Sequence, residues 1–508
     1  MKSKVTSLLL MLLLFPVISV MAQTGSVKGT VTDTNGDPLI GVSVIVDGSP
    51  VGTQTNIDGE FTLKAKAGDM LKFTYIGYRQ VIMPVPASGN IDLVMEEEAT
   101  ALDEVVVTAL GIKREQKALS YNVQTLKGDA FTANKDANFI NSLSGKVAGV
   151  NISSSSAGSG SAARVIMRGV KSISGNDNAL YVIDGIPMFD VNTGDTEGST
   201  MAKQPGSSSV ADINPDDIES MSVLSGPSAA ALYGSAAASG VILITTKKGT
   251  EGRAKLTYSN TTQFHRVWMT PKFQNTYGNT PGEFTSWGAK LETPTSYDPL
   301  DFFQTGVTEI NALTLTVGTQ KNQTFASAAV TNAPGVMPES DYNRYNFTIR
   351  NTTTFFNDKL TLDLGASYII QNNKNFVGSG HYFTPIPALW LFPRGDDFNE
   401  IRMFERWNPS RNLMTQYWPY GQENLALQNP YWTQKRMNRE ARKQRYMFNA
   451  SLKYDILPWL YVIGRVRVDN QNITYQEKFY ASTVNTLAGS DKGMYAENRT
   501  MDRTTYAD

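Results

Sequence analysis

The chain has 508 residues, with 46 basic and 47 acidic side chains, two histidines and no cysteine. This length indicates about three domains. The balanced charge lacks the excess of basic residues that is typical of proteins that bind nucleic acid. The absence of cysteine excludes thiol catalysis, thiolate metal sites and disulfide bonds. Because His265 and His381 do not lie in the spacing of a metal site, we expect no metal and no other cofactor.

Residues 1–22 have the pattern of an export signal peptide. Lys2 and Lys4 precede an apolar run at 8–14, and small residues lead to a cleavage site after Ala22. The alternative is an uncleaved membrane anchor, which Pro16 disfavours because it interrupts the apolar stretch. No later segment reaches ~18 continuous apolar residues, so no other helix is expected to span a membrane.

Residues 23–98 predict a small antiparallel β-sandwich. Short β-rich runs at 27–32, 42–46, 61–64 and 71–75 are separated by Asn-Gly and Asp-Gly turn signals. Short strands separated by turn sequences of this kind are typical of sandwich domains.

Residues 99–110 predict a linker that contains one extended segment. Three consecutive β-branched residues favour extended backbone, and a strand with no sheet of its own offers its edge to a partner. The alternative is a short edge strand or a sticky linker. The segment consists of Asp103, Glu104, Val105, Val106, Val107 and Thr108.

Residues 111–250 are rich in glycine, serine and alanine and predict a small α+β domain. We expect helical turns at 138–143 and 228–233 and strands at 164–169, 179–183 and 241–246. The acidic pair Asp216-Asp217 lies near no nucleophile motif, histidine or metal cluster. We therefore predict loop acids or helix caps there, and no enzymatic activity.

Residues 251–508 alternate between apolar and polar side chains with a period of two. The alternation is clear over 360–370, 448–456 and 460–468. Segments of about ten residues with this pattern are typical of a transmembrane β-barrel. A soluble sandwich gives the same alternation, so a second criterion is needed.

The lengths of the connections supply that criterion. Very short turns are expected at 320–322, 357–358 and 457–458. Between them we expect a long loop after His265, a medium one at 334–338 and a very long one at 372–444. Short turns at one end and long loops at the other indicate an outer-membrane barrel. The seven strands expected are 254–265, 309–319, 323–332, 345–356, 359–371, 445–456 and 459–473.

The strand count predicts an incomplete barrel. Seven complete strands, with room for an eighth before Asp508, fall short of the ~22 strands of plugged outer-membrane transporters. Because hydrocarbon does not tolerate unpaired sheet edges, we expect this chain to be the front portion of a longer polypeptide.

The longest loop is rich in aromatic residues between 381 and 432. Flat aromatic faces suit sugars, peptides and protein partners equally. A self-packed loop or an interfacial aromatic girdle is the alternative. The candidate contacts are Trp390, Trp407, Trp418 and Trp432.

Several phrases of the chain resemble one known family. They are VIMRG at 165–169, LYVIDG at 180–185, NPDDIES at 214–220, ALYGS at 231–235 and GVILITTKKG at 240–249. On these phrases the chain resembles the SusC/RagA-type TonB-linked outer-membrane transporters from residue 25 to its end. The plug-motif residues that the resemblance marks are Arg168, Gly169, Asp184, Gly185, Tyr233 and Gly234.

The resemblance implies a mainly β fold with three structural parts. They are a carboxypeptidase-regulatory-like sandwich, a plug at 111–250 and the first part of a large antiparallel transmembrane barrel at 251–508. It also implies a TonB box at 103–108, and an outer-membrane location in which the sandwich and plug face the periplasm. Arg168 is expected inside the lumen, where it pairs with a carboxylate or another hydrogen-bonding group, or simply reaches water.

The implied function is TonB-dependent active import of a large nutrient, an oligosaccharide in the first place or else a peptide. The implied partners are TonB with its inner-membrane motor, a SusD-like surface lipoprotein and outer-membrane lipid. Pairing of main chains would give TonB a grip that bears force. The alternatives are a receptor for siderophores or cobalamin, and an outer-membrane surface-binding protein without transport.

Overall fold

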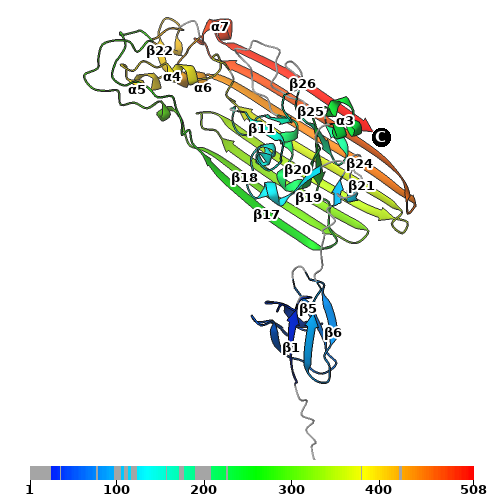
Figure 1. Cartoon of the computed structure of the whole chain (residues 1–508). Helices are drawn as coiled ribbons and strands as arrows, with labels where there is room; N and C mark the ends of the chain where they lie inside the picture. The colour runs from blue at the N-terminus through cyan, green and yellow to red at the C-terminus, as the bar shows by residue number, and fades with distance from the viewer. Residues whose placement is uncertain are drawn as a thin grey trace, which may run out of the picture. The chain divides into compact units, whose positions relative to one another are not determined.

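The computed structural model describes residues 25–34, 36–75, 78–96, 105–107, 113–115, 123–155, 157–170, 177–188, 208–224, 227–378, 380–422 and 426–508. Only the backbone is described at 105–107, 113–115 and 227–228. The predicted signal peptide at 1–22 lies outside the described residues. The chain divides into two compact units, Met1–Glu104 and Val105–Asp508 (Figure 1).

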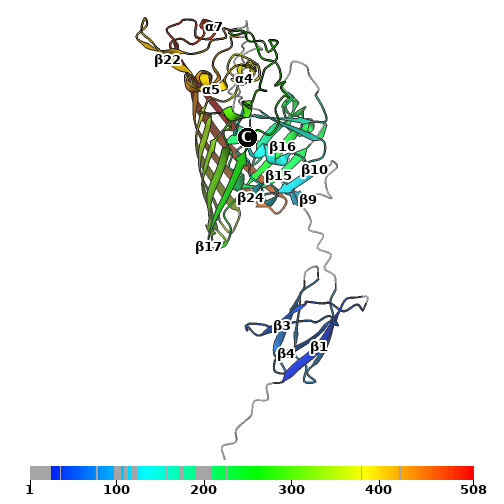
Figure 2. The same ribbon diagram turned by 90° about the vertical axis from the view of Figure 1, so that its left-hand side faces the viewer.

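The first unit is a two-layered β-sandwich, as predicted. One sheet has the order β4-β1-β7 and the other the order β3-β2-β5-β6 (Figure 2). Val31, Val44 and Phe73 are fully buried in the core between the sheets. The expectation of a wholly antiparallel sandwich is wrong, because β1 and β7 run parallel. The strands are β1 (Ser26–Thr32), β2 (Ser43–Val46), β3 (Gly52–Gln54), β4 (Glu60–Lys64), β5 (Met70–Thr74), β6 (Val81–Pro84) and β7 (Asn90–Val94).

The second unit begins with a short hairpin. Strand β8 (Val105–Val107) pairs antiparallel with β9 (Lys113–Glu115). The valine segment, which was expected to lack a sheet of its own, therefore has a partner strand within the chain. This pairing covers only three residues on each strand.

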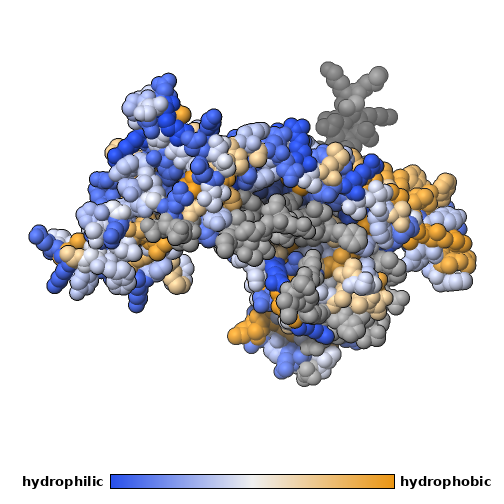
Figure 3. Space-filling view, turned by 90° about the horizontal axis from the view of Figure 1, so that it is seen from above, coloured by the Kyte–Doolittle hydropathy of each residue, from blue (hydrophilic) through white to orange (hydrophobic). Residues whose placement is uncertain are grey.

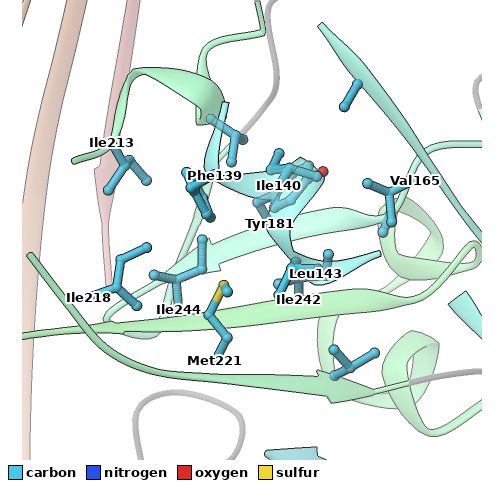
Figure 4. Packing of buried hydrophobic residues seen from close by; sticks show 14 of the residues in the cluster. Phe139, Ile140, Leu143, Val165, Tyr181, Ile213, Ile218, Met221, Ile242 and Ile244 are labelled. Atoms are coloured by element: carbon cyan, nitrogen blue, oxygen red, sulfur yellow. The ribbon is translucent and has the colours of Figure 1, made fainter. Parts of the chain in front are cut away.

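The α+β domain predicted at 111–250, called the plug below, is built around a five-stranded sheet of order β10-β15-β16-β13-β14. Its central strand β16 pairs with β15 and β13, and four consecutive residues of β16 are buried. Figure 4 shows Tyr181, Met221 and Ile244 of this sheet packed against Phe139 and Ile140. The sheet strands are β10 (Val123–Lys127), β13 (Leu180–Ile183), β14 (Ile186–Met188), β15 (Ile218–Leu224) and β16 (Val241–Thr246).

The remaining plug elements are short. Strands β11 (Val150–Ser154) and β12 (Ala163–Met167) form a separate pair. The helical turns are α2 (Asp129–Thr132), η4 (Phe139–Leu143), η5 (Val210–Asp212), η6 (Pro215–Asp217), α3 (Pro227–Tyr233) and η7 (Ser235–Ala237). The helical turns expected at 138–143 and 228–233 are present, and the strand expected at 241–246 is observed over the same residues.

The rest of the chain forms one curved antiparallel sheet of eight strands, with the plug on one of its sides (Figure 2). All seven predicted strands are present, and β26 is the eighth. The sheet order follows the chain through β17 (Gly252–His265), β18 (Gly306–Gly318), β19 (Asn322–Pro334), β20 (Asp341–Phe355), β21 (Leu360–Lys374), β24 (Met437–Leu457), β25 (Leu460–Phe479) and β26 (Met494–Ala507).

The two faces of this sheet have opposite character, as the alternation predicts. On β20, Phe347 and Ile349 are 50% and 53% exposed, whereas Asn346 and Arg350 are 3% and 7% exposed. The apolar side chains thus lie on the outer face, and the polar ones are buried beneath the plug. No helix among the described residues is long and apolar enough to cross a membrane.

Long loops gather at one end of the sheet and tight turns at the other (Figure 1). The loop end is largely hydrophilic, with smaller apolar patches (Figure 3). The connection between β21 and β24 packs around a core that includes Leu389, Phe392 and Phe398. The loops contain η8 (Pro299–Phe302), α4 (Ile386–Trp390), α5 (Phe398–Arg402), β22 (Glu405–Asn408), β23 (Leu413–Gln416), α6 (Pro430–Lys435) and α7 (Asn485–Ala488).

Candidate functional site at the junction of plug and sheet

Asp212, at the end of the helical turn η5, carries a fully buried carboxylate that faces strand β24. Lys443 Nζ lies 2.6 Å from Oδ1 of this residue, and a guanidinium nitrogen of Arg445 lies 2.9 Å from Oδ2. The other edge of Arg445 forms a bidentate pair with Asp469 on β25, at 2.8 and 2.6 Å. Arg445 also donates to the carbonyl of Ser209. A buried pair satisfied in this way is costly to break, because removing one partner leaves a charge without compensation.

Arg350 forms a second junction from strand β20. Its guanidinium makes a bidentate pair with Asp363 on β21, with both bonds at 2.8 Å. A third nitrogen lies 3.1 Å from Oδ2 of Asp184 in the plug and donates to the hydroxyl of Thr246. Lys248 Nζ lies 2.8 Å from Oδ2 of Asp363, an oxygen that also accepts from Arg350. One guanidinium therefore connects the wall and the plug, and a planar group with five donors suits that task.

Arg344 and Asn346 lie two residues apart on the inner face of β20 and bind the backbone of the plug. Arg344 is 1% exposed and donates to the carbonyls of Ala137, at 2.9 Å, and Ala211. Asn346 Nδ2 donates to the carbonyl of Asp212 at 2.6 Å. These bonds satisfy carbonyls in the irregular segments of the plug, where no strand partner is available.

Lys135 anchors the opposite part of the junction. Its ammonium lies 2.6 Å from Asp216 Oδ2 and 2.7 Å from the hydroxyl of Ser259 on β17. Lys135 is 2% exposed, so this contact is closed to solvent. The acidic residue that was predicted as a loop acid or helix cap thus belongs to a buried ion pair.

Its neighbour Asp217 is buried with a perturbed carboxyl group. The pKa of Asp217 is raised from 3.8 to about 6, mainly because the carboxyl group is buried, and the adjacent carboxylate of Asp216 contributes in the same direction. The hydrogen bond from Asn214 acts in the opposite direction. In the part of the chain that the structure describes, no group of three or more His, Asp or Glu side chains is placed to hold a metal ion.

Among the predicted plug residues, Asp184 and Gly185 form the turn between β13 and β14. Both have positive φ, at 51° and 83°, as a two-residue type I′ hairpin turn requires. Asp184 Oδ1 accepts a hydrogen bond from the backbone N–H of Thr246 at 3.0 Å. The turn holds the carboxylate of Asp184 in the position that Arg350 contacts. The LYVIDG motif at 180–185 therefore has a structural role.

The other predicted plug residues lie away from the junction contacts. Arg168 is exposed with φ 58°, followed by Gly169 with φ 91°. No carboxylate of the described residues forms an ion pair with Arg168, so its expected partner in the lumen stays a prediction. Tyr233 packs against the second apolar cluster of the plug, and Gly234 ends α3 with φ 73°.

The four predicted tryptophans have different surroundings. Trp432 is 1% exposed in a separate apolar cluster with Met437 and Phe479, and its indole N–H donates to Thr483. The prediction of a ligand or partner contact is therefore wrong for this residue. Trp390 and Trp418 pack against the core that includes Leu389 and Phe392. Only Trp407, among these four, is more than half exposed, at 58%. The self-packed loop therefore accounts for three of the four.

Within the predicted TonB box, only the backbone of Val105, Val106 and Val107 is described. Asp103, Glu104 and Thr108 lie outside the described residues. The structure thus gives a short strand at this position but no side-chain environment for it.

The sequence pattern did not single out the charged residues of the sheet that hold the plug. Arg350, Asp363, Lys443 and Arg445 all occupy polar positions of alternating strands. A charged side chain at an inward-facing position, where burial demands a partner, is the signal that could have found them. Asp212, the plug partner of Lys443 and Arg445, could not be chosen from sequence, because it lies 233 residues from Arg445.

Comparison with known proteins gives two domain matches. Residues 115–241 match the TonB-dependent Receptor Plug Domain, and residues 27–107 match the CarboxypepD_reg-like domain. The chain is 29% identical to the TonB-dependent receptor SusC of Bacteroides thetaiotaomicron over 460 residues, which is 88% of this chain and 44% of that protein. It is 31% identical to the TonB-dependent receptor P26 of Formosa agariphila, over 73% of this chain and 37% of that protein.

The fold has a counterpart among solved structures. The RagAB peptide importer in its open-open state matches with a TM-score of 0.60 at 18% identity, over 79% of this chain and 46% of the matched chain. This likeness concerns the fold alone. The chain spans less than half the length of each of these relatives.

Proposed function

Because the chain is a homologue of the TonB-dependent receptor SusC with a plug domain and a CarboxypepD_reg-like domain, we propose that it belongs to an energised importer of the outer membrane. In this proposal the plug closes the barrel, and TonB pulls on residues 103–108 to displace it. The imported nutrient is a large one, an oligosaccharide in the first place or else a peptide.

The observation that supports this proposal most is the way in which the plug is attached to the sheet. The apolar core of the plug is internal to it, and the contacts across the junction are mainly ion pairs and hydrogen bonds. A smaller apolar contact joins Ala137 of the plug to Ala333, Tyr342 and Phe376. A domain held by discrete polar contacts can be displaced without unpacking its own core, because water replaces the lost hydrogen bonds.

The position of the β8–β9 hairpin supports a handle for TonB. Its strands share only three paired residues, and an isolated two-stranded hairpin is marginally stable in water. A TonB strand could therefore replace β9 and pair with the valine segment through main-chain hydrogen bonds. Residues 105–107 lie directly before the plug in the chain, so force applied there would reach the plug first.

The loop end supports recognition of a large ligand or partner. Besides Trp407, the loop tryptophans Trp268 and Trp287 are 85% and 89% exposed. Exposed aromatic faces suit sugar rings, peptides and protein surfaces. We place a SusD-like lipoprotein at this end, and the sandwich and the plug on the periplasmic side of the membrane.

The test is nutrient uptake by cells that carry variants of the intact protein. We expect deletion of residues 103–108 to abolish uptake, and Val106→Pro to do the same, because proline removes a backbone donor and blocks strand pairing. Val106→Thr is the matched control and should retain uptake, since threonine keeps the β-branched backbone preference. Unchanged uptake after the deletion would refute the proposal and favour a surface-binding protein without transport.

The same strains distinguish between substrates. Loss of growth on oligosaccharides, on peptides or on iron-limited medium after deletion of residues 103–108 assigns the imported class. Loss on iron-limited medium alone would replace nutrient import by siderophore uptake.

A further inference from the structure

A cavity of about 60 Å³ lies between the plug and the inner face of the sheet. Its acidic lining residues are Asp184 and Asp217, and its basic lining residues are Lys247, Arg350 and Arg467. The charge of Arg350 is already compensated, because its guanidinium is paired with Asp184 and Asp363. Since one water needs about 10–15 Å³ of such space, the cavity has room for a few particles of water size.

Arg467, on the inner face of β25, has unused donors in this cavity. Its side chain is buried, with 7% of the residue exposed, and neither Nε nor one terminal nitrogen has a hydrogen-bond partner. No carboxylate of the described residues forms an ion pair with it. A buried guanidinium with unsatisfied donors is unfavourable, so an occupant of the cavity is expected to accept from it.

The acidic residues of the lining accept hydrogen bonds from groups other than Arg467. Asp184 accepts from the N–H and the hydroxyl of Thr246, at 3.0 and 2.7 Å, and from Arg350 at 3.1 Å. Asp217 accepts from Asn214 at 2.9 Å. Neither carboxylate accepts a hydrogen bond from Arg467 in the described part of the chain, so this guanidinium has no carboxylate in contact with it.

Two further features shape the space beside Arg467. Asn449 lines the cavity next to Gly365, where an added Cβ would lie 2.6 Å from the amide of Asn449. The glycine thus leaves room for the amide group against the wall. Asn346 Oδ1 also lines the cavity without a hydrogen-bond partner and requires a donor such as water.

We propose that this cavity is a binding site for a small monovalent anion of chloride size, held by Arg467 and accompanied by one water. The anion accepts from Nε and the terminal nitrogen of Arg467, and the water donates to Asn346. A divalent sulfate or phosphate would bring more negative charge than the single guanidinium of Arg467 compensates.

The bound anion compensates a charge of the sheet while it touches residues of the plug. The site exists only while plug and sheet are together, because both contribute its lining. By mass action the anion stabilises the docked plug, and the equilibrium constant for plug release falls about tenfold at an anion concentration ten times its dissociation constant.

A thiol probe measures plug release in the intact protein, because this chain has no cysteine. Ala329 on β19 is 4% exposed and pairs in register with Asn346, which contacts the plug. A cysteine at Ala329→Cys should react with a maleimide only when the plug moves away. We expect labelling to slow saturably as gluconate is replaced by chloride at constant ionic strength.

Arg467→Gln should remove this chloride dependence, whereas Arg503→Gln, at an exposed arginine of the next strand, should retain it. Chloride dependence that persists in Arg467→Gln, or equal labelling in chloride and gluconate, would overturn the proposal. If Arg467→Gln fails to fold, crystals of the unsubstituted protein in bromide decide the matter. An anomalous peak beside Arg467 supports the site, and water alone at that position refutes it.

Discussion

Asp212→Asn should loosen the plug by a large and measurable amount. Asparagine keeps the size of the side chain but removes the charge that faces Lys443 Nζ at 2.6 Å and Arg445 at 2.9 Å. Breaking a buried ion pair costs about 3–5 kcal/mol. Because Arg445 keeps its bidentate pair with Asp469, we use the lower limit.

A cost of about 3 kcal/mol corresponds to a roughly 150-fold increase in the population of the undocked plug. The assay is maleimide labelling of Ala329→Cys in the intact protein under conditions in which the plug redocks faster than the thiol reacts. The labelling rate then follows the equilibrium population of the open form. We expect it to rise by about two orders of magnitude.

The matched control is Asp129→Asn, at an exposed carboxylate of the plug helix α2. Exposed substitutions of this kind change stability by about 0.5 kcal/mol or less. A labelling rate in Asp212→Asn that is indistinguishable from that of Asp129→Asn would refute the reasoning that buried ion pairs hold the plug.

Three further predictions concern the same unit of the chain. The pKa of Asp217 is raised from 3.8 to about 6 in the docked plug, so the docked state binds a proton at a higher pH than the undocked state does. The stability of the docked plug therefore rises as pH falls through 6. Labelling of Ala329→Cys, normalised to an exposed thiol, should slow about tenfold from pH 7 to pH 5 and lose this dependence in Asp217→Asn. In a double-mutant cycle, Asp184→Asn and Arg350→Gln should couple by about 1–3 kcal/mol, and additive effects would contradict their contact. Trp432→Ala should destabilise its own apolar cluster with Met437 and Phe479 by about 3–5 kcal/mol in hydrogen exchange. Trp407→Ala should change that stability by about 0.5 kcal/mol or less, and equal effects would contradict the burial difference.

The sheet was predictable from sequence because its signal is local. An alternation of period two over Leu360 to Ile370 is enough to assign both the strand and the face of each side chain. The same rule failed at the ends of the longest strands. Strand β24 begins at Met437, eight residues before the expected start, because above the apolar band polar residues such as Glu440 and Arg442 lie on the outer face and the alternation disappears.

The junction was not predictable because its partners meet only after folding. Nothing local distinguishes Arg445 from the neighbouring basic residues of β24, and Asp212 lies in a short helical turn without a motif. The phrase that contains Asp184 was recognised by resemblance, but its contact with Arg350 spans 166 residues. In the sandwich, the parallel pairing of β1 with β7 was not predicted for the same reason, since the sequence signals of a strand do not specify its partner strand.

We propose that TonB grips the segment at 103–108, and the most direct test of this grip is a single cysteine at Val106→Cys in the intact protein, in cells that carry cysteine-substituted TonB. The account predicts a disulfide cross-link to TonB that increases when substrate is added, while Val51→Cys, at an exposed position of the sandwich, gives none. Cross-linking at Val106→Cys that does not exceed that of Val51→Cys would contradict the account.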